Sequence, residues 1–194
     1  MSHYFIQKTL LFIQNNTNYN KKELLKIQYG IEGVFLTLFK VFFILLIGVI
    51  FHYFPIVFIT ILFFNILRFF AFGLHAKKSS HCLILSLIEF NLLPYLLLRV
   101  SISSFMIWMI SIITLISFLL FAPADTEKRP LTNPKKRNIR KILSIVSFFI
   151  MLIIAYHIKY LQVPILAAFL IEDFSINPLS YKLLGLSYNN YKNQ

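Results

Sequence analysis

The sequence predicts an all-α protein, a polytopic membrane helical bundle of about five to six membrane segments. Hydrophobic residues make up 58% of the 194 residues, and charged residues only 13%. Soluble domains contain roughly 45–50% apolar and 25% charged residues, so the apolar excess is expected to face lipid. The 19 lysines and arginines fall between the apolar runs, a placement typical of topology signals and not of nucleic-acid binding.

Residues 1–33 are predicted to form N-terminal amphipathic helices that lie in the membrane interface. Apolar residues recur at helical spacing within 3–14 and again within 22–31, and an Asn-rich turn separates the two stretches. A soluble segment that caps the bundle explains the pattern equally well. The first residues lack the basic start and cleavage site of a signal peptide, so insertion is expected to depend on the later apolar runs.

The rest of the chain alternates apolar runs with short polar segments. About 20 helical residues, at ~1.5 Å each, cross ~30 Å of hydrocarbon. Residues 34–122 hold the first four predicted spans, which cover 34–54, 55–72, 82–98 and 104–122. A basic connector, 123–141, precedes the last spans in 142–186, where the sixth run (163–171) is either a span or a re-entrant segment. We therefore assign residues 1–194 to one integral-membrane domain.

The basic residues predict the orientation. Residues 1–33, 68–81, 124–141 and the tail after 178 hold 16 of the 19 lysines and arginines. Because basic loops stay in the cytoplasm, both termini and the segment 73–82 are expected there, in a multi-pass protein of the cell membrane. A lone cysteine on that side stays a reduced thiol.

The connector is a candidate binding surface. Its last seven residues, 135–141, carry five positive charges and include Lys135, Lys136 and Arg137. Three prolines in the connector disfavour a continuous helix. The charges are explained either by topology and attraction to anionic lipid or by docking of an acidic peptide.

The segment 73–82 is the candidate site of chemistry, because it holds the only cysteine and two of the five histidines. In one unbroken helix His75 and Cys82 would lie ~10 Å apart, too far for proton transfer. Gly73 and the polar residues after His75 predict a break, with a new helix starting near Ser79 or Ser80. The imidazole can then fold back toward the thiol. The helix N-terminus, with Lys77 and Lys78 nearby, favours the thiolate in the first turn.

The alternatives at this segment are structural. A lone cysteine in an apolar helix is commonly an inert small hydrophobic residue, and His81 would point to a different face from Cys82. For the acid that orients His75, Glu32 is preferred because its depth is closest to the segment; Glu89, Glu172 and Asp173 are the other candidates. One cysteine and scattered histidines give no metal-ligand spacing, so neither a metal nor a cofactor is expected.

Taken together, Arg68, Gly73, His75 and Cys82, placed between two spans, resemble the active-site segment of the accessory gene regulator B (AgrB) membrane peptidases. Residues 122–130 resemble that family's proline-containing basic loop. The segments 29–40 and 172–178 are similar to its first and last spans, so the resemblance covers nearly the whole chain.

The resemblance implies a membrane cysteine endopeptidase of quorum sensing that cleaves the C-terminal part of an AgrD-type pro-peptide. Cys82 would attack the peptide bond with His75 as general base, and the thioester would be captured by a Cys or Ser of the peptide to give a cyclic product. Its substrates pair an amphipathic leader with an acidic tail. The residues implied to bind such a substrate are Arg68, Lys77, Lys78, Lys135, Lys136 and Arg137.

The chain departs from the family pattern at one place, and its other expected partners and its alternative functions are as follows. Family members often carry Pro or small residues after the His-Ala pair, where this chain has Lys77 and Lys78. Anionic lipids and a second copy of the chain are further expected partners. The alternative functions are a small transporter that uses Lys40, Glu89 and Glu172 as pathway charges, and a non-catalytic membrane scaffold.

Overall fold

The computed structural model describes residues 19–75, 79–126 and 130–193, together with residues 8, 11, 13 and 17. Within them the chain is helical without a β-strand, which confirms the predicted all-α bundle. The described helices are α2 (Lys21–Ile50), α3 (Phe54–Ala71), α4 (Ser79–Leu87), the π-helical turn η1 (Ile88–Leu92), α5 (Leu93–Arg99), α6 (Ser104–Phe121), α7 (Pro134–His157), α8 (Lys159–Ile176), α9 (Pro178–Leu183) and the 3₁₀ turn η2 (Asn190–Asn193).

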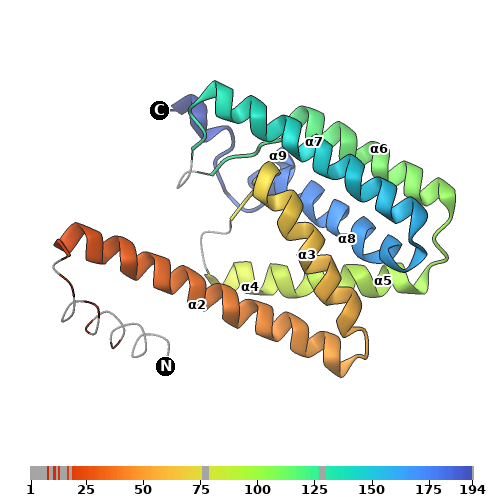
Figure 1. Cartoon of the computed structure of the whole chain (residues 1–194), viewed down its shortest axis with the longest axis horizontal. Helices are drawn as coiled ribbons and strands as arrows, with labels where there is room; N and C mark the ends of the chain where they lie inside the picture. The colour runs from red at the N-terminus through yellow and green to blue at the C-terminus, as the bar shows by residue number, and fades with distance from the viewer. Residues whose placement is uncertain are drawn as a thin grey trace. The chain divides into compact units, whose positions relative to one another are not determined.

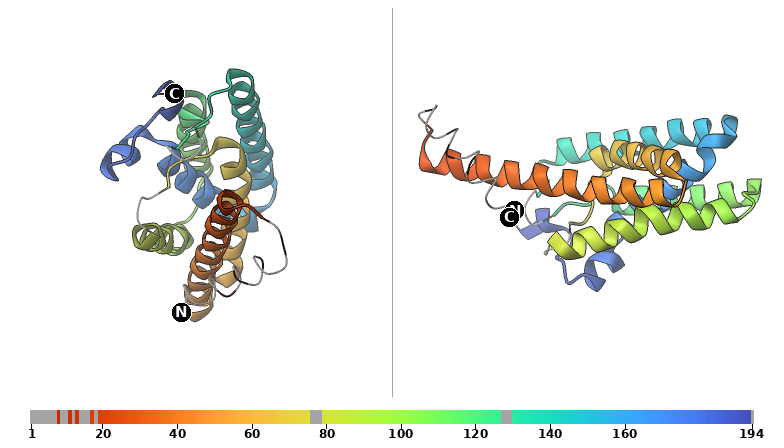
Figure 2. Two further views of the ribbon diagram at one scale, coloured as in Figure 1. Left: turned by 90° about the vertical axis from the view of Figure 1, so that its left-hand side faces the viewer. Right: turned by 90° about the horizontal axis from the view of Figure 1, so that it is seen from below.

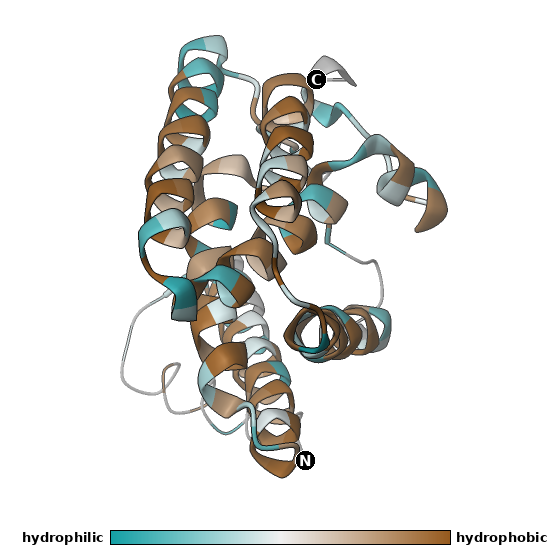
Figure 3. Ribbon diagram, turned by 90° about the vertical axis from the view of Figure 1, so that its right-hand side faces the viewer, coloured by the Kyte–Doolittle hydropathy of each residue, from teal (hydrophilic) through white to brown (hydrophobic). Residues whose placement is uncertain are grey.

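Five helical segments of the described chain are long and apolar enough to cross a membrane, so the protein is a multi-pass membrane protein. They cover Glu23–Ile50, Phe54–Ala71, Ser80–Arg99, Ser104–Phe121 and Pro134–His157. Hydrophobic residues make up most of the length of the helices (Figure 3), and many large hydrophobic side chains are exposed. On α6, for example, Phe105 is 74% and Leu120 is 66% exposed, which suits side chains that face lipid.

The chain forms two compact units, Met1–Phe43 and Ile44–Gln194. The first unit contains most of α2, a continuous helix of 30 residues. The interfacial position expected for residues 21–33 stays a prediction, but these residues do not form a separate helix, because α2 runs through Gly30 and Gly33 without a break. A helical glycine costs only about 1 kcal/mol, too little to end a helix by itself. The other predicted interfacial helix, 3–14, lies outside the described residues except for positions 8, 11 and 13.

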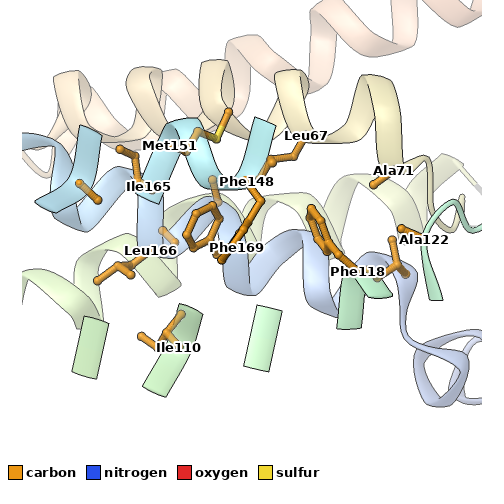
Figure 4. Close-up of a cluster of buried hydrophobic side chains, with 14 of the residues drawn as sticks. Leu67, Ala71, Ile110, Phe118, Ala122, Phe148, Met151, Ile165, Leu166 and Phe169 are labelled. Atoms are coloured by element: carbon orange, nitrogen blue, oxygen red, sulfur yellow. The ribbon is translucent and has the colours of Figure 1, made fainter. Parts of the chain in front are cut away.

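In the second unit, α8 is the central helix. It packs against α3, α6, α7 and α5 (Figures 1 and 2). The segment 165–169 of α8 is fully buried, and the rings of Phe148 and Phe169 lie 4.9 Å apart in the core that Figure 4 shows. The weak sixth run of the sequence is therefore one helix of 18 residues. Hydropathy detects only its middle, because its last turns carry Glu172 and Asp173.

The basic connector is partly helical, which corrects its predicted extent. The α7 helix begins at Pro134 and not at residue 142. The side chain of Asn133 accepts hydrogen bonds from the N–H groups of Lys135 (3.0 Å) and Lys136 (3.2 Å). Proline is well tolerated at the first helical position, since the N–H that it lacks would have no partner there. Lys135, Lys136 and Arg137 thus lie in the first turn of α7.

Candidate active site

The structure brings His75 and Cys82 together. The Sγ atom of Cys82 lies 4.0 Å from Nδ1 of His75, within the second unit. The α3 helix ends at Ala71 and α4 begins at Ser79, so the break between them that the sequence predicts is confirmed. Cys82 is the fourth residue of α4 and is half-buried, whereas His75 is exposed. An exposed imidazole beside a partly shielded thiol can accept its proton once the distance shortens.

The backbone before His75 is held by two other segments. The N–H of Gly73 donates to the carbonyl of Ala124 (2.8 Å), and the N–H of Leu74 donates to the carbonyl of Ser175 (2.8 Å). The N–H of Ala124 in turn donates to the carbonyl of Ala71 (2.9 Å). The short segment that delivers His75 is therefore fixed between the connector and the end of α8.

Gly73 is required by this geometry, and we expect Gly73→Ala to slow alkylation of the Cys82 thiol by about tenfold or more, because the change displaces His75. Its φ is +125°, a conformation that L side chains rarely adopt, and an added Cβ would overlap the Arg68 guanidinium and lie 2.8 Å from the carbonyl oxygen of Ser175. The measurement is the rate of Cys82 alkylation together with thermal unfolding. Gly185→Ala is the matched control, since φ is +61° there but a Cβ meets nothing within 4 Å. Equal effects of the two changes would show that φ alone matters.

Arg68 contacts the same segment from α3. One guanidinium nitrogen donates to the carbonyl of Leu74, and Nη1 lies 3.9 Å from Oε2 of Glu172 on α8. The guanidinium carbon also lies 5.7 Å from the centre of the Phe64 ring. Arg68 thus connects α3 to the backbone at Leu74 and to Glu172 on α8. The substrate-binding role that the resemblance implies for Arg68 stays a prediction.

The connector is itself anchored by the C-terminal segment. The carboxylate of Asp125, only 1% exposed, accepts hydrogen bonds from the N–H groups of Leu131 (3.2 Å), Asn190 (3.0 Å) and Tyr191 (2.9 Å). The hydroxyl of Tyr181 donates to the carbonyl of Asp125 (3.1 Å). Burial raises the pKa of Tyr181, so this hydroxyl stays a neutral donor. Ala124, which forms a β-bridge with Phe72, is therefore followed by a residue that several hydrogen bonds tie to the C-terminal segment.

The predicted cations of the connector differ in availability. Lys135 and Lys136 are exposed, whereas the Arg137 guanidinium stacks 3.6 Å from the centre of the Tyr191 ring. Nη1 of Arg140 donates to the carbonyl of Phe69 (2.7 Å), and its guanidinium lies 4.4 Å from the Phe72 ring centre. An open surface pocket of about 300 Å³ lies between α3 and α7 and is lined by Phe69, Phe70, Lys136, Ile139, Arg140 and Leu143. Lys136 and Arg140 thus lie beside the last turn of α3, a few residues before His75.

The remaining predicted residues fall elsewhere. Lys77 and Lys78 lie outside the described residues. Glu32 lies on α2 in the first unit, where Oε1 accepts a hydrogen bond from Nε2 of Gln28 (3.0 Å), and its role as the orienting acid stays a prediction. His81 is exposed on α4. In the described part of the chain, His, Cys, Asp and Glu side chains form no group of three that could hold a metal.

Several contacts that build the site were not predicted. Ala124 and Ser175 contribute backbone carbonyl groups. Every residue has such a group, so the residue types give no indication of these contacts. The pairing of Arg68 with Glu172 did leave a signal, since a base and an acid each stand near the end of an apolar run. Charges placed in this way usually face the bundle interior and pair with one another.

Residues 6–176 match the family model for accessory gene regulator B. The chain belongs to the AgrB family. The match includes His75, Cys82 and Glu172, and it covers all five candidate spans. No solved structure matches the chain.

Curated relatives of the AgrB family agree with this assignment. An AgrB-like protein of Clostridium acetobutylicum is 33% identical over 174 residues, which cover 87% of this chain and 82% of the relative. Accessory gene regulator protein B of Staphylococcus carnosus is 33% identical over 147 residues, 76% of each chain. An AgrB-like protein of Listeria welshimeri is 37% identical over 128 residues, 65% of this chain. The matched part spans 63% of that relative, less than two thirds of its length.

Proposed function

We propose that this AgrB-family chain is a membrane cysteine endopeptidase that cleaves the C-terminal part of an AgrD-type pro-peptide and gives a cyclic signal for quorum sensing. Family membership supports a role in the accessory gene regulator system. The observation that carries the enzymatic proposal is the approach of the Cys82 thiol to the His75 imidazole, 4.0 Å. A nucleophile and a base within reach of one another are the minimum of a cysteine peptidase.

The reaction follows from these two groups. His75 takes the proton of Cys82, and the thiolate attacks the carbonyl carbon of the scissile peptide bond. The C–N bond breaks, and His75 returns the proton to the leaving amine. All of the peptide before this bond, the leader together with the signal sequence, stays on Cys82 as a thioester. A Cys or Ser of that peptide then attacks the thioester carbonyl. This step forms the thiolactone or lactone and releases the Cys82 thiol.

Cyclisation requires that the internal nucleophile react faster than water. A thioester keeps its acyl group activated, and a nucleophile held close by has an effective concentration far above that of a free one. Cys82 is half-buried in the first turn of α4, close to the predicted membrane surface. Partial exclusion of water there favours ring closure over hydrolysis.

The orientation belongs to the same proposal. The excess of basic residues in the regions 1–33, 68–81, 124–141 and after 178 supports a cytoplasmic position for both termini and for the active site. Anionic lipids at the start of α7 and a second copy of the chain remain expected partners.

Lys135 and Lys136 are proposed to bind the acidic tail of the pro-peptide, and the double change Lys135→Gln with Lys136→Gln is expected to raise KM about tenfold at low salt while kcat changes little. Both side chains are exposed in the first turn of α7. The measurement is the salt dependence of processing in vesicles. Lys159→Gln, an exposed cation at the first residue of α8, is the matched control. An unchanged KM and salt dependence in the double variant would remove these residues from substrate binding.

The direct test of the function is processing by the purified full chain in lipid vesicles. An AgrD-type pro-peptide is expected to yield two products, a cyclic peptide and the released acidic tail. Mass spectrometry identifies the cyclic peptide because it is lighter by one water than the linear peptide that hydrolysis of the same bond would give. A non-catalytic scaffold leaves the pro-peptide intact, and a transporter moves it across the membrane uncut.

A further inference from the structure

Glu172 is a fully buried acid that is connected to the candidate site through Arg68. It lies in the last turns of α8, its side chain is 0% exposed, and neither carboxylate oxygen accepts a hydrogen bond from the described residues. Its ion-pair partner is Arg68, with Nη1 3.9 Å from Oε2. Burying a carboxylate costs several kcal/mol, so a buried acid of a membrane bundle is seldom without a role.

Arg68 connects Glu172 to the segment that carries His75. The second guanidinium nitrogen donates to the carbonyl of Leu74, the residue directly before His75. The N–H of the same residue donates to the carbonyl of Ser175, three positions after Glu172 on α8. Leu74 is therefore held at both polar backbone groups by the end of α8, once directly and once through Arg68.

We propose that Glu172 is a positioning residue that holds His75 next to Cys82, acting through Arg68 on the Leu74 carbonyl. This inference rests on the proposed function. Glu172 orients the guanidinium so that it can bond the Leu74 carbonyl, and a fixed Leu74 restricts where the next residue can place its imidazole. The distance of 4.0 Å between Sγ of Cys82 and Nδ1 of His75 is the result of this arrangement.

The identity of both side chains matters for this role. The planar guanidinium of Arg68 carries donors that point in two directions, so one can face the carboxylate while the other bonds a carbonyl. A lysine ammonium at the same position can pair with Glu172 but cannot reach both partners with the same geometry. Glu89 and Asp173 are the other acids that interact electrostatically with Glu172, so a control for the loss of buried charge is needed.

The test compares Glu172→Gln, Arg68→Lys, His75→Ala and Asp173→Asn in the full chain in lipid vesicles. Iodoacetamide reports on Cys82 alone, because the chain has one cysteine. We expect E172Q and R68K to slow alkylation at neutral pH about tenfold and to move the midpoint of its pH profile toward that of H75A. In pro-peptide processing by the E172Q protein, kcat falls and KM stays within about twofold, because Glu172 is not among the residues expected to bind the substrate.

Asp173→Asn is the matched control, since Asp173 is also a buried acid, 8% exposed, but accepts its hydrogen bond from Thr114 (2.9 Å). Its alkylation profile is expected to match the unaltered protein. Equal losses in D173N and E172Q overturn the proposal, and so does an unaltered profile in E172Q when H75A is slow. Loss of folding in both E172Q and R68K also overturns it, because positioning requires a bundle that folds without the ion pair. If H75A itself reacts like the unaltered protein, the proposed function fails instead.

Discussion

Replacement of Cys82 by alanine is expected to abolish pro-peptide processing, with a loss of about 10⁴-fold or more, while the protein stays folded in the membrane. The change removes the only thiol of the chain and hence the atom that forms the acyl-enzyme. The side chain is half-buried near the start of α4 and is not part of the buried core, so its loss leaves little cavity. The measurement is the yield of cyclic peptide from vesicles, and size-exclusion chromatography in detergent reports on folding.

Cys82→Ser distinguishes a nucleophile from a structural thiol. A serine hydroxyl fills nearly the same space but is a much weaker nucleophile without the full set of groups that activate it, so processing should stay at background. Ser80→Ala, a change at an exposed neighbour on α4, is the control and should leave the yield unchanged. Cyclic product from the C82A protein would contradict the mechanism.

His75→Ala is expected to lower kcat by about 10²- to 10⁴-fold, which is the usual contribution of a general base. Without the imidazole 4.0 Å away, the thiol of Cys82 has to lose its proton to water. Alkylation of Cys82 at neutral pH should slow in parallel, and raising the pH should restore part of both rates.

His81→Ala is the matched control for His75→Ala. His81 adjoins Cys82 in the sequence and is exposed on α4, but the imidazole within reach of the thiol belongs to His75. The H81A protein should keep its activity within about twofold. A large loss of activity in the H81A protein with full activity in the H75A protein would identify His81 as the base and contradict the assignment to His75.

The approach of His75 to Cys82 could be predicted from the sequence, because it depends on a helix break that nearby residues indicate. Gly73 and the polar residues that follow it interrupt two apolar runs, and the structure places the helix break there. A break of this kind brings residues seven positions apart closer than one helix allows. The charge pattern and the apolar runs likewise predicted a membrane bundle.

The supports of the site could not be predicted in the same way. Leu74 bonds the carbonyl of Ser175 and Gly73 bonds that of Ala124, contacts between segments about 50 to 100 residues apart that depend on how the helices pack. The positions of Arg68 and Glu172 near the ends of apolar runs indicate that both face the bundle interior, but they do not tell which charges pair with one another. Depth along the membrane, the criterion that favoured Glu32, says nothing about which helices are neighbours.

The helix boundaries show a second limit of sequence reasoning. The run of prolines and charges in 123–141 predicted an irregular connector, yet Asn133 caps α7 and Pro134 begins it. Proline ends a helix when it stands inside and favours one when it stands at the first position, and only the local capping contacts decide between the two.

The central claim is that Cys82 carries the peptide as a thioester, and trapping this adduct tests it most directly. A pro-peptide whose ring-forming Cys or Ser is replaced by Ala cannot cyclise, so the acyl-enzyme should accumulate in vesicles that contain the unaltered chain. Mass spectrometry should then find Cys82 carrying all of the peptide before the scissile bond, the leader together with the signal sequence, and hydroxylamine should remove this adduct. An intact protein beside a cleaved peptide, or an adduct on another residue, would contradict the account.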